Sequence, residues 1–338
     1  MKTNIIRAVL PGLLLSAWLT GCSDRQVVLR EGEDERVKIR LSASLSATKG
    51  AVGSLEELDA LPEKFGIYGA DTRQEDASKT LGEEWGNPMR MDNVRAVGID
   101  TLGRITLERD YTYDRDESSY VKFCAYSPYA PTGKQTAGGS YVESPTAGRA
   151  PTLQFALNGR QDLMWAAPVT GNKLTVPRGF VFEHLLTQLR FQIADAAGTM
   201  EGSSVKAIIF SGVGTLCSVD LETGETGEWT APTDDITLDI PAPVPVTGKP
   251  EAPQPLGSEI MLPPGQEYFT IRVVTDRDVY RNIRIRPAEP EKTFRAGKAY
   301  LITLSFNVSD QPGGDPTDIK VGVTLKAWEK GGYSDADV

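Results

Sequence analysis

The sequence has a single histidine, His184, and only three cysteines among its 338 residues. A Ser-His-Asp hydrolase would need that histidine beside an activated serine, and the sequence contains no Gly-x-Ser-x-Gly motif. The cysteines Cys22, Cys124 and Cys217 form no Cys-x-x-Cys pair and no second cluster, so they have no zinc-site spacing. We therefore expect no enzyme activity, no metal site and no cofactor.

Long helical patterns are also scarce, because no apolar periodicity of helical type extends beyond about three turns. Short apolar stretches separated by glycine, aspartate, serine and proline indicate strands instead. The 338 residues suffice for about two domains. Acidic residues exceed basic ones by 46 to 36, which argues against nucleic acid or an anionic lipid surface as a partner. The prediction is an all-β ectodomain with few short helices.

The chain has one long apolar run, at its N-terminus, where Pro11 interrupts it and it is too short to span a bilayer. A basic start, a short apolar core and small residues at the end predict a secretory signal at residues 1–21. The run closes with Leu19-Thr20-Gly21-Cys22, which resembles the lipobox of bacterial lipoproteins, whose cysteine is acylated. We expect Cys22 to carry lipid and residues 22–36 to form a flexible charged spacer.

The first predicted strand covers residues 37–45. Apolar and polar residues alternate strictly along it, as in a strand with one buried face. Its apolar positions are Val37, Ile39, Leu41, Ala43 and Leu45. After a break of small residues, Ser54 is placed to cap a short helix that Pro62 ends.

Two patterns in the second half predict irregular structure. In one apolar run, the residues expected on the buried face of a strand change from even to odd positions. They are Phe180, Phe182 and His184 before the change, and Leu189 and Phe191 after it. This change predicts a bulge or kink near Thr187-Gln188. The segment from Pro232 to Pro264 is rich in proline and is predicted to be a long loop or an excursion between strands, because proline blocks pairing within a sheet. A turn at 170–172 is the expected domain boundary.

The roles of three groups of side chains can each be interpreted in two ways. Cys124 and Cys217 could form a disulfide, but buried free thiols are favoured since both lie in apolar runs. His184 is favoured as a structural, hydrogen-bonded core residue. Aromatic residues could form a glycan-binding platform, although most rings in β-sandwiches fill the core. The aromatics concerned are Tyr111, Tyr113, Tyr120, Tyr126, Tyr129, Trp85, Trp165, Trp229 and Trp328.

Several stretches, taken in order, resemble the Bacteroidetes fimbrillin family of lipoprotein pilins and Mfa-like proteins. They are Phe65-Gly66-Ile67-Tyr68-Gly69, residues 121–130 around Phe123-Cys124-Ala125-Tyr126, Gln161-Asp162-Leu163-Met164-Trp165-Ala166, residues 182–191, residues 294–300 and residues 323–332. Each stretch is weak alone, but their order behind a lipobox is fairly specific.

The resemblance implies two tandem transthyretin-like β-sandwich domains with Greek-key-type topology, at 37–172 and 173–338. It also implies a lipid-anchored protein of the outer membrane and cell surface, or of the fimbrium if processed. In such pilins an Arg-specific protease removes the first strand, and a donor strand from another subunit fills the groove. The expected partners are other fimbrial subunits, of the same or another kind, and a host or bacterial surface receptor.

Carried onto this sequence, the removable strand is Val37 to Leu45, with Val37, Ile39, Leu41 and Leu45 filling the groove. The basic residue in the following linker is Lys49, where the family has arginine, and Arg40 lies inside the strand. A chain that is not cut there would keep its lipid and could act as an anchor or adhesion protein. The alternative is a surface lipoprotein that binds glycans through exposed aromatics without polymerising.

Overall fold

The computed structural model describes residues 36–46, 53–73, 75, 85–86, 89–198, 200–230, 235–307 and 318–326. The predicted signal, Cys22, the spacer up to Glu35 and Lys49 lie outside these residues. The described chain consists of strands and one short helix, as predicted. Within this part of the chain, no helix is long and apolar enough to cross a membrane.

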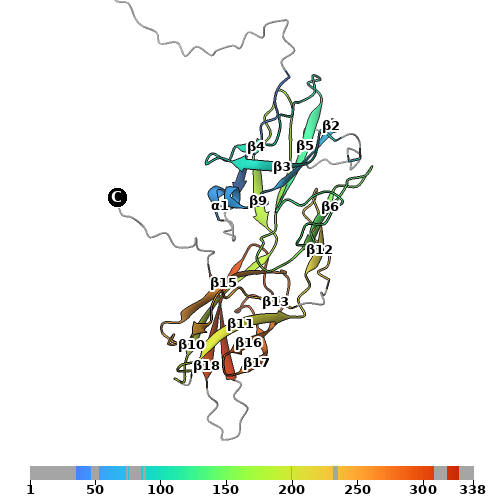
Figure 1. Ribbon diagram of the computed structural model, residues 1–338. Coiled ribbons are helices and arrows are strands. Elements are labelled where there is room, and N and C mark those ends of the chain that lie inside the picture. Colours follow the sequence, from blue (N-terminus) through green and yellow to red (C-terminus); the bar gives the residue numbers. More distant parts are fainter. Residues whose placement is uncertain are drawn as a thin grey trace, which may run out of the picture. The chain divides into compact units, whose positions relative to one another are not determined.

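Most of the first half forms a seven-stranded sheet with the order β1-β9-β8-β5-β2-β3-β4 (Figure 1). Its strands are β1 (Ala43–Leu45), β2 (Gly66–Thr72), β3 (Met91–Ile99), β4 (Ile105–Leu107), β5 (Tyr120–Ser127), β8 (Met164–Gly171) and β9 (Phe180–His184). Short apolar stretches of the sequence at residues 65–69, 94–99, 104–107 and 121–126 supply four of these strands.

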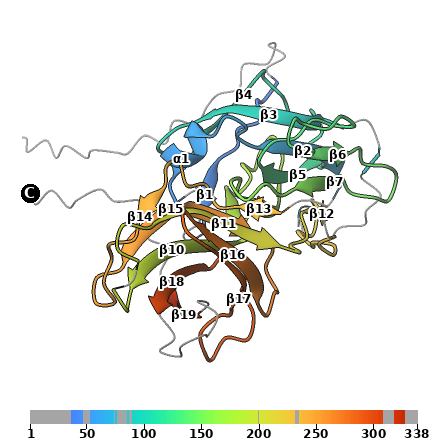
Figure 2. The ribbon, with the colours of Figure 1, turned by 60° about the horizontal axis from the view of Figure 1, so that its bottom comes forward.

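Three smaller sheets hold the other strands. A four-stranded sheet has the order β15-β10-β18-β19, a second sheet the order β13-β11-β16-β17 with β14 added on β11, and a three-stranded sheet the order β12-β7-β6. Figure 2 shows β12 beside β6 and β7. The strands are β6 (Tyr141–Glu143), β7 (Thr152–Ala156), β10 (Thr187–Asp195), β11 (Ser204–Ser211), β12 (Leu216–Asp220), β13 (Ile236–Thr237), β14 (Val244–Pro245), β15 (Gln254–Leu262), β16 (Phe269–Thr275), β17 (Val279–Ile285), β18 (Ala299–Asn307) and β19 (Asp318–Lys326).

The helix α1 (Leu55–Ala60) begins where the sequence predicts. The Ser54 side chain accepts a hydrogen bond from the Glu57 amide at 3.1 Å, which satisfies one of the free donors of the first turn. The helix ends before Pro62, and its Leu58 is fully buried. The helix thus adds one apolar side chain to the core beneath the seven-stranded sheet.

The seven-stranded sheet lies between two apolar cores, so its central strands are buried on both faces. On β2, Ile67 belongs to one core and Tyr68 to the other; on β5, Phe123 and Cys124 are divided in the same way. One core also contains Ile39, Leu41 and Ala43 of the first strand segment. The other core continues without interruption into the sheets of the second half.

The phase change near Thr187 is a change of sheet, not the predicted bulge within one strand. β9 ends at His184 in the seven-stranded sheet, and β10 begins at Thr187, where it pairs with β15 and β18. The even-numbered side chains of β9 and the odd-numbered side chains of β10 are therefore buried in two different cores. The register of β10 with β15 does shift, but further on, between Leu189 and Phe191.

The prediction of a loop from Pro232 to Pro264 is wrong for residues 254–262, which form β15. β15 lies at the edge of its sheet, where one side of the strand makes no ladder bonds. Proline is tolerated at such edges, and Pro255 pairs opposite Gln192 there. Pro255 is the one proline within β15, and the other prolines of the segment lie outside this strand.

Strand pairing crosses the predicted domain division at 172/173 in three pairs of strands, one of which is β1 with β9. β9 follows the division but pairs with β8, which precedes it. β12, at residues 216–220, pairs with β7, at residues 152–156. The division into two sandwich domains stays a prediction.

Candidate functional site

The first strand segment, residues 37–45, lies between two other segments and makes main-chain hydrogen bonds to both. On one side, the amides of Tyr113 and Ile105 donate to the carbonyls of Val37 and Leu41 at 3.0 Å each. On the other side, β1 runs parallel to β9, with Ala43 opposite Phe180 and Leu45 opposite Phe182. The segment therefore joins β9 to the chain that follows β3, and completes the sheet.

The side chains of this segment divide between core and solvent. Ile39, Leu41 and Ala43 are 7%, 6% and 5% exposed and belong to the core, and Leu45 packs against it half-buried. Val37, which the sequence also assigned to the groove, is 43% exposed. Burial of the isoleucine and leucine contributes roughly 1.5–3 kcal/mol each. The apolar contacts that hold the segment in place therefore come mainly from the residues at its centre.

Two glycines allow the neighbouring chains to approach the middle of the segment. A Cβ atom at Gly103 would lie 2.2 Å from the Ala43 carbonyl oxygen, and Gly103 has a φ of +79°. On the opposite side, a Cβ atom at Gly179 would lie 2.8 Å from the Ser42 hydroxyl oxygen. Residues 42 and 43 thus fit between two glycine backbones.

The two candidate cleavage residues differ in what surrounds them. Arg40 is exposed, but its neighbours Ile39 and Leu41 are tied to Tyr111 and Ile105 by main-chain hydrogen bonds of 2.8 and 3.0 Å. A protease needs an extended, unpaired chain, so the hydrogen-bonded state of the segment protects the Arg40 bond. Lys49 lies outside the described residues.

A buried ion pair that the sequence analysis missed connects β5 with the turn after β12. The Lys122 ammonium group donates to the Glu222 carboxylate, and the two side chains are only 2% and 13% exposed. The Trp85 indole donates to the other Glu222 oxygen at 2.7 Å, and its ring lies 5.6 Å from Lys122 Nζ. The only sequence signal was a lone lysine in the apolar run of β5.

His184 and the two cysteines have the structural roles that the sequence favoured. His184 is buried and its Nδ1 lies 2.6 Å from Asp162 Oδ2. Cys124 and Cys217 are free and buried. Burial raises the pKa of the Cys217 thiol to about 12 and raises the pKa of Cys124 further. Neither thiol has the depressed pKa of a nucleophile.

Most of the aromatic residues considered for a glycan platform fill the cores. Trp85, Tyr111, Tyr113 and Tyr126 are buried. The hydroxyl of Tyr126 donates to buried Asn93 at 2.8 Å, which fixes it inside. Tyr120, Tyr129, Trp165 and Trp229 are half-buried, and Trp328 lies outside the described residues. These rings therefore do not form the exposed platform.

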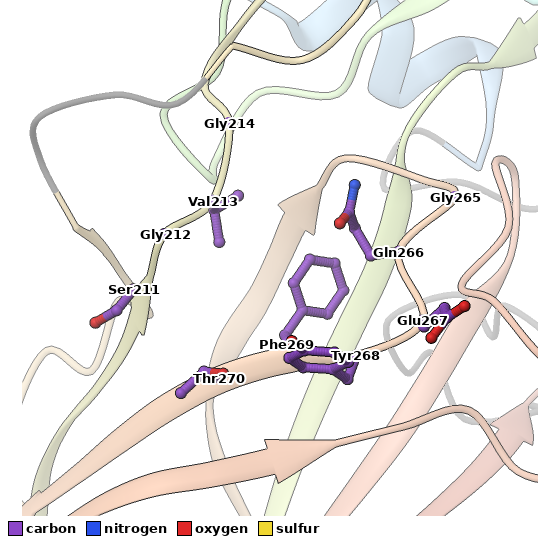
Figure 3. A pocket seen from close by; sticks show the side chains of 10 residues that line it. All are labelled: Ser211, Gly212, Val213, Gly214, Gly265, Gln266, Glu267, Tyr268, Phe269 and Thr270. Atoms are coloured by element: carbon purple, nitrogen blue, oxygen red, sulfur yellow. The ribbon is translucent and has the colours of Figure 1, made fainter.

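The exposed aromatic side chain of the described residues is Tyr268, which the sequence analysis did not single out; it is 39% exposed. It lines a pocket of about 470 Å³ between the loop at 211–214 and the turn before β16. Figure 3 shows Val213 and Gln266 on opposite sides of this pocket. No periodic pattern marked Tyr268, because it stands just before the first residue of β16.

These observations define a class: an all-β protein whose first segment completes a sheet between two other segments of its own chain. The profile of the fimbrillin-like family matches residues 57–328. The chain belongs to the fimbrillin-like family, which confirms the resemblance seen in the sequence.

Solved structures show the same fold. A fimbrial protein from Bacteroides vulgatus has a TM-score of 0.58 at 16% identity, covering 87% of this chain and 100% of that one. A candidate cell adhesion protein from Bacteroides uniformis has a TM-score of 0.53 at 20% identity, covering 88% and 99%. No curated protein sequence is significantly similar to the chain.

Proposed function

We propose that this protein is a non-enzymatic, lipid-anchored fimbrial subunit or anchor protein of the outer membrane that assembles by donor-strand exchange and serves adhesion. The observation that carries the proposal is the position of residues 37–45, which supply Ile39 and Leu41 to the core from between two other segments. Loss of this segment would expose the edge of β9 and an apolar groove. A strand from another subunit would restore both.

The chain itself contains a segment suited to that groove. Residues 37–43 read Val-Lys-Ile-Arg-Leu-Ser-Ala, and residues 321–327 read Val-Gly-Val-Thr-Leu-Lys-Ala. The apolar positions match in type and spacing at all four places. Among the described residues, β19, which holds most of the second segment, pairs with β18 alone and lies at a sheet edge. These features support a second copy of this chain as one donor, beside other fimbrial subunits.

Limited trypsin digestion of a chain that begins at Ser23 tests strand exchange. We expect cleavage after Lys49, because the bonded segment protects Arg40, followed by loss of residues 23–49 and formation of oligomers. Mass spectrometry identifies the cut, and light scattering after size exclusion measures the mass. The Lys49→Gln variant is the matched control and should stay monomeric. A cut chain that releases the segment yet remains a monomer would contradict strand exchange.

A peptide of residues 318–328 tests the donor. It should bind the cut chain and block its oligomerisation, since it presents the same apolar series as the lost strand. A peptide with Val323→Asp and Leu325→Asp is the control and should do neither. If both peptides act alike, the match between the two segments has no role in assembly.

The protease specificity can be examined separately. An Arg-specific protease should leave the linker of the natural chain intact and cut the Lys49→Arg variant there. For the anchor, Cys22→Ser should move the protein out of the membrane fraction and abolish labelling by a fatty-acid analogue. Equal labelling of both forms would remove the lipid anchor from the proposal.

A further inference from the structure

The edge strand β17 and the residue that follows it, Arg286, carry a cluster of basic side chains in a chain that is acidic as a whole. Arg281, Arg284 and Arg286 are exposed, while the whole chain has a net charge of −10. Within the described residues, none of the three forms a salt bridge. Their guanidinium donors are therefore free to meet a negatively charged ligand from solvent.

Tyr268 holds two of these arginines in place. The Cζ atoms of Arg284 and Arg286 both lie 4.9 Å from the centroid of the Tyr268 ring. This contact restricts two long side chains that would otherwise move freely, so less entropy is lost when their N–H groups bind a ligand. A guanidinium group suits a carboxylate in particular, because its two parallel N–H groups match the two oxygens.

The pocket beside Tyr268 offers polar groups of a different kind. The residues that line it include Ser211, Gln266, Glu267 and Thr270 (Figure 3). Its volume of about 470 Å³ lies in the range of small-ligand sites. Glu267 accepts hydrogen bonds from hydroxyl groups but repels a ligand that carries several negative charges.

We infer that Tyr268, Arg284 and Arg286, together with this pocket, bind an acidic sugar, with its carboxylate on the two arginines and its hydroxyls on the pocket wall. Many hydroxyls and one carboxylate per unit are the chemistry of uronic and sialic acids. Glu267 disfavours an acidic peptide, whose charges are denser. This site does not depend on the proposed strand exchange.

Basic side chains also protect an edge strand from pairing with other chains, and this role must be separated from binding. Arg281 provides the matched control, because it lies on the same strand with the same charge but makes no contact with the Tyr268 ring. A site for acidic sugars depends on Arg284 and Arg286 alone, whereas edge protection involves all three arginines.

Calorimetric titration of the uncut chain from Ser23 tests the inference with sialyllactose and methyl glucuronide as the two acidic sources, each with one carboxylate, and with lactose and polyglutamate as comparators. We expect one or both acidic sugars to bind below about 1 mM and the comparators not to bind. Arg284→Gln and Arg286→Gln should each weaken binding by about tenfold or more, and Arg281→Gln by less than about twofold. Arg284→Lys should weaken it almost as much as Arg284→Gln, since lysine lacks the planar fork.

Absence of binding by both acidic sugars would overturn the inference. Equal binding of lactose or polyglutamate, or an equal loss in Arg281→Gln, would also overturn it. Thermal unfolding of each variant shows whether it is folded, and the exposed positions of these arginines predict unchanged midpoints. Should Arg284→Gln be unfolded, Arg284→Lys gives the same readout with the charge retained.

Discussion

The ammonium group of Lys122 lies almost fully buried against Glu222, with the Trp85 indole on the second carboxylate oxygen. Removal of one member of such a pair leaves the other charge buried without its partner, which costs about 3–5 kcal/mol. We expect Lys122→Met to lower the free energy of unfolding by that amount, and Glu222→Gln added to it to restore most of the loss. Urea unfolding measures both.

The control for this prediction is Lys38→Met. Lys38 and Asp110 also form an ion pair, but their side chains are 58% and 70% exposed. Solvent screens such a pair, so its loss should cost less than about 1 kcal/mol. Similar losses in Lys38→Met and Lys122→Met would mean that solvent reaches the Lys122 pair as well.

The thiols give a prediction about pH. Burial raises the pKa of Cys217 to about 12 and that of Cys124 further, so both stay protonated in the folded chain at pH 9. In the unfolded chain they regain an ordinary pKa and form thiolate there. A chain from Ser23 should therefore react with a thiol reagent at pH 9 only after denaturation. Rapid labelling of the native chain would show that either thiol is accessible.

At the scale of single elements, Gly103 controls how closely the first strand segment fits. Gly103→Ala combines two costs, a β-carbon at positive φ and a collision with the Ala43 carbonyl. Gly133→Ala has the first cost alone, since Gly133 has a φ of +65° and open space around it. We expect Gly103→Ala to be about 1 kcal/mol or more less stable than Gly133→Ala. It should also be cut faster at Arg40.

Urea unfolding and the rate of tryptic cleavage at Arg40 measure these two effects. If Gly133→Ala is as unstable as Gly103→Ala, backbone strain accounts for the whole effect and the close approach at Ala43 adds nothing. If stability falls without faster cleavage, the collision weakens some other part of the sheet.

The elements that could be predicted from the sequence are those with local signals. Strict alternation marked residues 37–45, of which residues 43–45 form β1, and a serine cap with a following proline marked α1. The sequence showed that the apolar residues change phase after His184. It could not show whether the chain bulges within one strand or passes into a second sheet that faces a different core, because both give the same pattern. Pairing at a distance left no local trace. Glu222 stands 100 positions from Lys122, and Tyr268 meets its arginines only because β16 and β17 pair.

At the scale of the whole molecule, the two halves of the described chain share one apolar core. Tyr68 and Cys124 from the first half belong to the same cluster as Phe191 and Ile302 from the second. Pairing of β7 with β12 and the Lys122 ion pair add polar contacts between the same halves. Removal of either half would expose a large part of this core to water.

A shared core of this kind predicts cooperative unfolding. Tryptophan fluorescence reports the surroundings of Trp85, Trp165 and Trp229 among the described residues, while far-ultraviolet circular dichroism follows all the strands. In urea the two signals should change together in one transition. Lys122→Met should lower the urea midpoint of both signals by the same amount. Two separate transitions would instead support two independent domains divided near residue 172. In that case Lys122→Met, which weakens only the contact between them, would leave at least one midpoint unchanged.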